Sequence, residues 1–231
     1  MLLRADCGRV VPSPGTISRE TRCPVDSGKS ALILIGYQND YFAPNGILHH
    51  VIEEASRVSG VLQNTLDLVE RVSSTDMLIV STPILFTENY EELVDPVGIL
   101  KTIKEVGAFR EDTQGGKTID AIARFGDRIV EVPGKRGLNA FSNTELEALF
   151  HQRGITDVLV AGVVTSICVD STGRAAFESG FRVSILSDCT CGRTPYEQEF
   201  YCGEIFPLYA RVLNREELLA ELGAGREQVS G

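Results

Sequence analysis

The sequence predicts an α/β fold, with one doubly wound, mostly parallel six-stranded sheet and helices on both of its faces. Short apolar runs without alternation, such as 31–35 and 157–161, are typical of parallel strands buried on both faces. Segments with helical spacing lie between them, so repeated strand–helix units with right-handed crossovers are expected. The 231 residues and the 43% hydrophobic content suit one such Rossmann-like domain.

The predicted strands follow the apolar runs in chain order. The first, 31–35, is apolar throughout, as expected for a central strand, and Pro83 helps to end the second. The six expected strands are 31–35, 77–80, 128–132, 157–161, 182–186 and 210–213.

The predicted helices follow the spacing of apolar residues and the capping signals. Apolar residues recur at helical spacing from 51 to 72, which predicts one helix there. Asn143 is the expected cap of a helix that ends at Gly154. The connection 84–116 is long, and such connections often carry function. Further helices are expected near 99–106, 118–124, 168–179, 197–208 and from 215 onward.

Composition limits the organisation and the partners of the chain. Residues 1–29 are expected to form an irregular arm, 30–222 the domain and 223–231 a flexible tail. The net charge of -10 argues against nucleic acid and anionic membranes as partners. The sequence shows no signal-peptide pattern and no membrane span. Six cysteines are too dilute for a disulfide scaffold, so we expect free thiols in the cytoplasm.

Cys168 is the candidate nucleophile. It follows an apolar strand that ends in Gly162 and a turn of small residues, where a helix is expected to begin. Backbone N–H groups at a helix start stabilise a thiolate and a developing oxyanion. An inert buried cysteine is the alternative interpretation, but the strand–turn–cysteine–helix context favours a nucleophile.

A second candidate, Lys135, lies in a loop expected at the same edge of the sheet. Ligands of doubly wound sheets bind beyond the carboxyl ends of the strands, where the winding direction switches. The segments after Gly36, at 133–139 and at 163–168 are expected there. An ammonium at this place stabilises a thiolate or a reacting carbonyl. A solvated loop lysine is the alternative, and Arg136 is expected to face solvent.

Four separated segments resemble those of one enzyme family. The segment GVVTSICV at 162–169 resembles its nucleophile segment, and Lys135 begins a stretch that resembles its lysine loop. Further matches are Gln38, Asp40 and Phe42, Ala140, Phe141, Thr144 and Leu146, Thr172, Ala175 and Gly180, and Ser187 and Asp188. From about Ala31 to Leu222 the chain therefore resembles the isochorismatase-like cysteine hydrolases.

The resemblance implies an enzyme of the amidohydrolase branch, which includes N-carbamoylsarcosine amidohydrolases and ureide-type amidases. Its nucleophile would be Cys168 and its catalytic lysine Lys135. Its oxyanion hole would be formed by the N–H groups of Val164 and Cys168, beside a cis peptide bond between Val163 and Val164. The thiol attacks an amide, carbamoyl or ureide carbonyl, an amine leaves, and water hydrolyses the thioester. An aspartate after the first strand takes the thiol proton and returns it to the leaving group.

Gly36 stands where the family carries this aspartate. A positioned acid/base group contributes about 10²–10⁴ in rate, so we expect impaired activity and a gain in turnover from Gly36→Asp. Three explanations stay open: an altered copy of an active hydrolase, a natural relative with another proton acceptor, or a catalytically silent small-molecule-binding or structural homologue. Asp40 is expected to have a structural role, and the glutamates at 88, 91 and 92 are expected to face solvent.

The expected substrate contacts come from the same segments, although aromatic residues at such places more often belong to a core or an interface. Nicotinamidases of the family carry an Asp-x-His…His metal site after the second strand, whereas residues 81–88 lack histidine. We therefore expect no metal, no cofactor and a substrate other than nicotinamide. The candidate substrate-binding residues are Tyr37, Gln38, Phe42, Phe86 and Val163.

Two further expectations concern partners. The resemblance implies a small-molecule substrate and a homo-oligomer, either a dimer or a tetramer. A nucleotide-binding protein is the rival from another class, because the doubly wound sheet permits one. The turn at 36–40 lacks the G-x-G-x-x-G loop that such proteins use, so the sequence favours the hydrolase.

Overall fold

The computed structural model describes residues 25–229, with side-chain burial given up to residue 223. Most of the predicted arm, 1–29, lies outside the described residues, and only Ser27–Lys29 within it forms a 3-10 turn. One parallel six-stranded sheet has the order β3-β2-β1-β4-β5-β6, which confirms the predicted fold class. The strands are β1 Ser30–Ile35, β2 Leu78–Ser81, β3 Val130–Glu131, β4 Asp157–Val163, β5 Arg182–Cys191 and β6 Arg211–Leu213.

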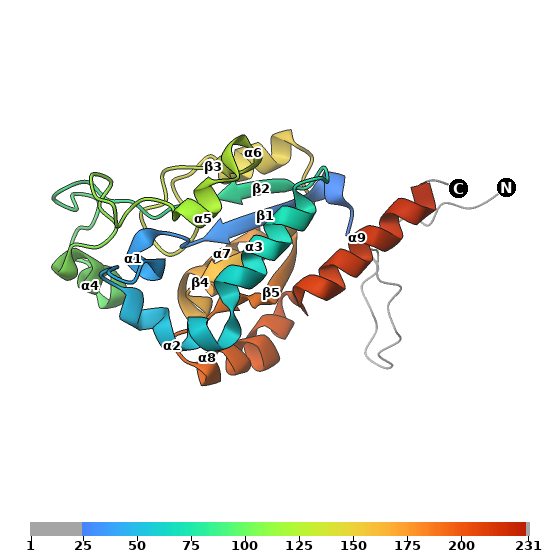
Figure 1. Cartoon of the computed structure of the whole chain (residues 1–231). Helices are drawn as coiled ribbons and strands as arrows, with labels where there is room; N and C mark the ends of the chain where they lie inside the picture. Colours follow the sequence, from blue (N-terminus) through green and yellow to red (C-terminus); the bar gives the residue numbers. More distant parts are fainter. Residues whose placement is uncertain (1–24, 230–231) are drawn as a thin grey trace.

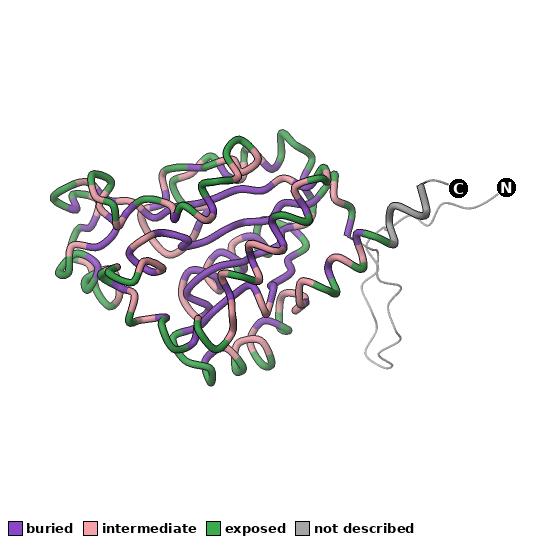
Figure 2. The backbone as a smooth tube through the Cα atoms, in the orientation of Figure 1, coloured by how far each residue is buried: buried purple, intermediate pink, exposed green. Residues whose placement is uncertain are grey.

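Helices cover both faces of the sheet, and β1 explains how the sequence specifies this (Figure 1). Successive side chains of a strand point to opposite faces. Leu32 and Leu34 of β1 pack in one core cluster, whereas Ile33 and Ile35 pack in the other. Every residue of β1 is buried, and Figure 2 shows the strands as the buried centre of the molecule. An uninterrupted apolar run is therefore what this central strand requires.

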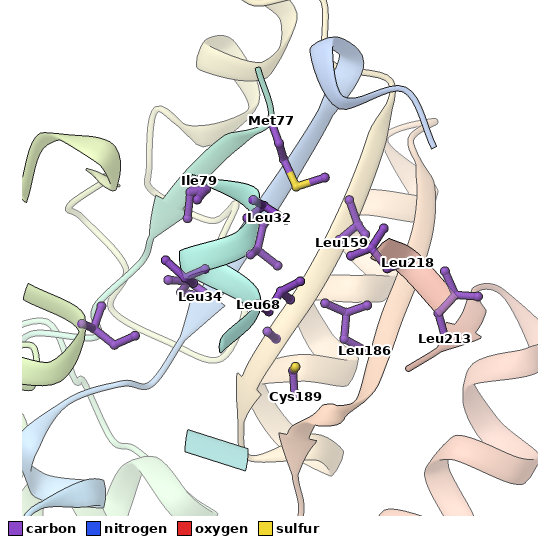
Figure 3. Close-up of a cluster of buried hydrophobic side chains, with 14 of the residues drawn as sticks. Leu32, Leu34, Leu68, Met77, Ile79, Leu159, Leu186, Cys189, Leu213 and Leu218 are labelled. Atoms are coloured by element: carbon purple, nitrogen blue, oxygen red, sulfur yellow. The ribbon is translucent and has the colours of Figure 1, made fainter. Parts of the chain in front are cut away.

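Each core cluster is closed by its own set of helices. The first cluster places Leu68 and Leu218 against Leu159 of β4, as Figure 3 shows. These leucines come from α3 (Val61–Val72) and α9 (Arg215–Val229), and α5 (Asp120–Ala123) adds Ile122. The second cluster receives Phe150 from α6 (Leu146–Gln152) and Ala176 from α7 (Asp170–Glu178).

A third cluster caps the carboxyl end of the sheet. The helices α1 (Asn39–Phe42), α2 (His49–Ser59) and α4 (Gly98–Val106) lie at this end, at the left of Figure 1. Tyr41, Ile52, Ile103 and Phe109 pack there against Val163 at the end of β4. This cap covers the edge where the sequence places the functional residues.

The long helix predicted over 51–72 is wrong, because the chain forms two helices that meet at Gly60. Gly60 has φ +67, a left-handed conformation that favours glycine, and the Oγ of Ser59 accepts from the N–H of Val61. The Asn143 cap is also wrong. Asn143 has φ +61, and α6 begins after Glu145 without a side-chain cap. The apolar spacing continues across Gly60, so it does not reveal that the helix breaks there.

The remaining differences concern where elements end. Both β4 and β5 extend beyond their predicted ends, to Val163 and Cys191, past a register shift between Val160 and Gly162. The helix predicted over 197–208 is α8 (Pro195–Phe200) followed by two short turns, 201–205 and 206–208. The predicted tail from Gly223 lies partly in α9, which continues to Val229, and 230–231 lie outside the described residues.

We expect Gly162→Ala to destabilise the protein by about 2 kcal/mol or more, as overpacking does. Gly162 has φ +129, and a Cβ there would overlap the backbone of Ile35 in the neighbouring strand. Gly203→Ala is the matched control, because a Cβ at Gly203 has no neighbour within 4 Å. Thermal unfolding of both variants measures the difference, and equal melting temperatures would contradict the prediction.

Candidate active site

The carboxyl ends of β1, β3 and β4 bring Gly36, Lys135 and Cys168 together around one pocket. The pocket lies where the strand order switches from β1 to β4, the place at which such sheets bind ligands. Lys135 Nζ lies 3.7 Å from Cys168 Sγ. Lys135 is only 1% exposed and Cys168 7%, so Lys135 is not a solvated loop lysine.

Cys168 lies in the first turn of a helical segment that starts directly after β4. This turn, Thr165–Val169, runs on into α7, so the helix begins earlier than the predicted residue 168. The peptide bond between Val163 and Val164 is cis. The carbonyl of Val164 accepts from the N–H groups of Ile167 and Val169, at 3.1 and 3.2 Å. The N-terminal end of this helical segment therefore lies beside the thiol.

Arg136 is more exposed than Lys135, as expected, and it also holds the lysine loop in place. Its guanidinium donates to the carbonyl of Leu85 and forms ion pairs with Glu92 at 3.4 Å and Glu111 at 3.9 Å. The N–H of Leu85 in turn donates to the carbonyl of Lys135 at 3.3 Å. The connection that follows β2 thus fixes the backbone from which the lysine extends.

A second contact joins the lysine loop to the nucleophile helix. The N–H of Ala140 donates to Thr172 Oγ1 at 3.1 Å, and Thr172 lies in α7, directly after the Cys168 turn. Gly134 lets the loop turn beside Lys135, because it has φ +105 and a Cβ there would overlap the carbonyl oxygen of Asn143. The loop and the helix therefore set the distance between the amine and the thiol.

Within residues 25–223, Lys135 forms no ion pair with a carboxylate, and its amine contacts Cys168. Asp40 does not take the place of this missing carboxylate. Its carboxylate accepts from the N–H groups of Phe109 at 2.6 Å and Ile47 at 3.5 Å, the structural role expected for it. Glu88 is exposed, and Glu92 is bound to Thr87 and Arg136.

Gly36 is a structural requirement of the backbone at this place. It has φ +74, and a Cβ there would lie 2.7 Å from the carbonyl oxygen of Val163 and 3.6 Å from Tyr41 Cδ2. Any side chain at position 36 must therefore displace the end of β4. For this reason we no longer expect Gly36→Asp to restore an acid/base group.

The five predicted substrate contacts separate in the structure. Val163 lines the pocket. Tyr37 belongs to the core on the opposite face of the sheet, where its hydroxyl bonds Thr65 at 2.6 Å and Phe42 stacks on its ring.

The remaining two predicted substrate contacts, Gln38 and Phe86, also point away from the pocket. Gln38 donates to the carbonyls of Ile84 and Gly116, and Phe86 is fully buried against Tyr90. These contacts are structural, so the substrate-binding role predicted for Tyr37, Gln38, Phe42 and Phe86 is not retained.

Sequence reasoning missed most of the pocket wall. Tyr41 lies four residues after Tyr37 in the sequence and lines the pocket. Ile99 and Ile103 of α4 line it as well. The signal that pointed toward α4 was the length of the connection 84–116. Leu138 and Ile167, which flank the lysine and the cysteine in sequence, also line the pocket.

The other described cysteines lie in different surroundings. Burial raises the pKa of Cys189 to about 12, and that of Cys191 and Cys202 to about 11. Cys168 is the described cysteine whose sulfur lies beside a lysine amine. No group of three or more His, Cys, Asp and Glu within the described residues is arranged to hold a metal ion. No helix in the described part of the chain is long and apolar enough to span a bilayer.

Comparison with known proteins identifies the family. A model described as the isochorismatase domain matches residues 30–217. The chain belongs to the isochorismatase family. The isochorismatase family protein YecD of Escherichia coli O157:H7 is 36% identical over 88 residues, which is 38% of this chain and 47% of that relative. This match therefore spans about half the length of the relative.

Solved structures of the family share the fold. A cysteine hydrolase from Pseudomonas syringae pv. phaseolicola 1448A has a TM-score of 0.74 at 18% identity, over 88% of this chain and 96% of that chain. An N-carbamoylsarcosine amidase from Thermoplasma acidophilum has a TM-score of 0.64 at 19% identity, over 82% and 98% of the two chains. Both the family match and the shared fold therefore support an isochorismatase-like hydrolase.

We expect iodoacetamide at neutral pH to modify Cys168 before Cys189, Cys191 and Cys202, because burial keeps those thiols protonated. Lys135→Met is expected to slow the reaction roughly tenfold, the ratio given by ~1.4 kcal/mol of lost thiolate stabilisation. Peptide mapping by mass spectrometry locates the label. The control is Lys101→Met on the surface of α4, and equal effects of the two variants would contradict the prediction.

We expect Gly36→Asp and Gly36→Ala to lower stability by a similar amount, about 1–3 kcal/mol, because both introduce the same Cβ beside Val163. Gly36→Asp is not expected to raise turnover. Thermal unfolding and ammonia release from a panel of small amides measure the two effects. A Gly36→Asp protein with wild-type stability and higher turnover would show that the end of β4 yields easily.

Proposed function

We propose that this protein is a cysteine hydrolase that cleaves the C–N bond of small amide, carbamoyl or ureide compounds through a thioester on Cys168. The observation that carries the proposal is the buried amine of Lys135, 3.7 Å from the thiol, at the switch point of the sheet. Membership of the isochorismatase family supports hydrolysis. The N-carbamoylsarcosine amidase of similar fold supports a C–N bond as the target.

In the proposed reaction, Lys135 and Cys168 share one proton, so that the attacking group is a thiolate beside an ammonium. The sulfur forms a bond to the carbonyl carbon, and the N–H groups of Val164 and Cys168 receive the oxyanion. As the C–N bond breaks, Lys135 gives its proton to the leaving nitrogen, which departs as ammonia or an amine. Water then attacks the thioester, Lys135 takes a proton from it, and the C–S bond breaks to release the acid.

Lys135 thereby replaces the family's aspartate as the proton carrier, which favours the interpretation of this chain as a natural relative with another acceptor. The fit of the backbone around Gly36 supports this over the loss of an aspartate from an otherwise unchanged site. Because one lysine serves every proton transfer, we propose a low turnover. An acid/base group in the ordinary position contributes about 10²–10⁴ in rate.

A catalytically silent small-molecule-binding homologue is the second candidate. The observation that favours it is that no carboxylate within residues 25–223 forms an ion pair with Lys135. Such a protein would bind amides in the same pocket without releasing ammonia. Turnover by the wild-type chain therefore distinguishes the two candidates.

We expect wild-type protein to release ammonia or amine from at least one compound in a panel of small amides, carbamoyl compounds and ureides. Cys168→Ser is expected to reduce this activity by about 10³ or more, because a hydroxyl is a far weaker nucleophile at neutral pH. Lys135→Arg is expected to lose about 10², since a guanidinium stays protonated and cannot take a proton from water. Coupled ammonia assays measure both.

Cys202→Ser is the matched control, because Cys202 is half-buried away from the pocket and donates no group to it. It should keep wild-type turnover. Activity that survives Cys168→Ser would exclude the thioester. Binding of amides without any turnover by the wild-type chain would establish the silent homologue instead.

A further inference from the structure

The wall of the Cys168 pocket is apolar except for three side chains, those of Lys135, Cys168 and Tyr41. Among the described residues that line it, none is Asp, Glu, Arg or His. The apolar part consists mainly of large aliphatic and aromatic side chains: Ile84, Ile99, Ile103, Phe109, Leu138 and Ile167. The pocket is thus built for apolar groups at every point away from the reacting carbon.

This wall disfavours a charged substituent on the substrate. An ionised group buried without a partner loses its hydration, which costs several kcal/mol. Lys135 is the cation of the pocket, but its amine already contacts Cys168 and is needed at the reacting carbonyl. Each methylene placed against the apolar wall instead strengthens binding, because it leaves water.

Tyr41 supplies an uncharged donor to this apolar space. Its side chain is 4% exposed, and its hydroxyl has no hydrogen-bond partner within residues 25–223. Other buried tyrosines are bonded, Tyr37 to Thr65 and Tyr90 to the carbonyl of Ala108. Buried tyrosine hydroxyls ordinarily find a partner. The hydroxyl of Tyr41 is therefore free to bond a ligand.

The hydroxyl of Tyr41 is also held in its donor form. Burial, followed by the nearby Cys168 and Asp40, raises the pKa of Tyr41 well above its usual range. It therefore stays protonated at neutral pH. A polar atom of the substrate that accepts a hydrogen bond is its natural partner.

The helix α4 contributes one face to the pocket. Ile99 and Ile103 are four residues apart, so they lie on the same side of the helix and both line the pocket. Val106 and Lys101 of α4 are exposed and do not line the pocket. The same helix therefore provides both the residues that touch a ligand and matched control positions.

We propose that the pocket selects an uncharged amide-type compound with an apolar acyl group. Tyr41 donates a hydrogen bond to its polar end, and Ile99 and Ile103 of α4 select the acyl group. The substrate class rests on the proposed function, because the amide is assigned through the thioester chemistry of Cys168.

Alkylation of Cys168 tests the selectivity without requiring turnover. Three probes with the same leaving group are compared: iodoacetamide, N-benzyl iodoacetamide and iodoacetate, each normalised to its rate with glutathione. In each reaction the thiolate sulfur bonds to the methylene carbon and iodide leaves. N-benzyl iodoacetamide is expected to react at least tenfold faster than iodoacetate. Equal or faster reaction of iodoacetate, drawn by Lys135, would overturn the proposal.

Variants of α4 locate the selectivity. Ile103→Thr is expected to reduce the preference for the benzyl probe several-fold, whereas Val106→Thr, the same kind of change outside the pocket, is expected to leave it unchanged. Circular dichroism and thermal unfolding identify any variant that fails to fold, and Ile99→Thr then serves in place of Ile103→Thr. An unchanged preference in a folded α4 variant would overturn the role of this helix.

Steady-state kinetics separate this inference from the proposed function. Isobutyramide and benzamide are expected to be better substrates than glycinamide and succinamate, which carry a charge. Tyr41→Phe should raise KM for the neutral amides about fivefold, as the loss of one neutral hydrogen bond does. Tyr196→Phe, on an exposed ring, is the control. Equal hydrolysis of charged amides would overturn the inference alone, and apolar probe selectivity without any hydrolysis would overturn the proposed function alone.

Discussion

The burial of Lys135 beside Cys168 is the constraint on which the rest of the site depends. An ammonium removed from water needs a partner, and the group given to it here is a thiol at 3.7 Å rather than a carboxylate. The loop around the lysine is accordingly well anchored, by Arg136 to the connection after β2 and by Ala140 to α7. The scaffold thus holds together the amine of Lys135 and the thiol of Cys168, whose charges depend on which of the two carries the shared proton.

The close approach of β1 and β4 belongs to the same arrangement of the site. Gly36 and Gly162 each lie where a Cβ would meet the backbone of the other strand, so the two strand ends approach closely. The place where the resemblance puts an acidic side chain is filled by Val163 and flanked by Tyr41. A carboxylate at position 36 would therefore require the end of β4 to shift.

Much of this arrangement follows from the sequence, and the failures have physical reasons. The parallel sheet and the convergence of Lys135 with Cys168 follow from buried apolar runs and from the rule that strand ends carry ligands. Gly60 and Asn143 were misjudged because left-handed backbone leaves no trace in apolar spacing. The pocket wall was misjudged because the turn between β1 and α1 has no regular spacing: Tyr37 enters the far core, and Tyr41 of α1 lines the pocket with Cys168. Tertiary packing alone decides which aromatic does which.

The position of α4 has a consequence for how such proteins diverge. This helix sits in the connection between β2 and β3, whereas the thiol and the amine are carried by segments that follow β4 and β3. The parts that perform the chemistry and the part that chooses the acyl group are therefore encoded in separate stretches of the chain. Substitutions in α4 can therefore change which acyl group is preferred while Lys135 and Cys168 keep their spacing.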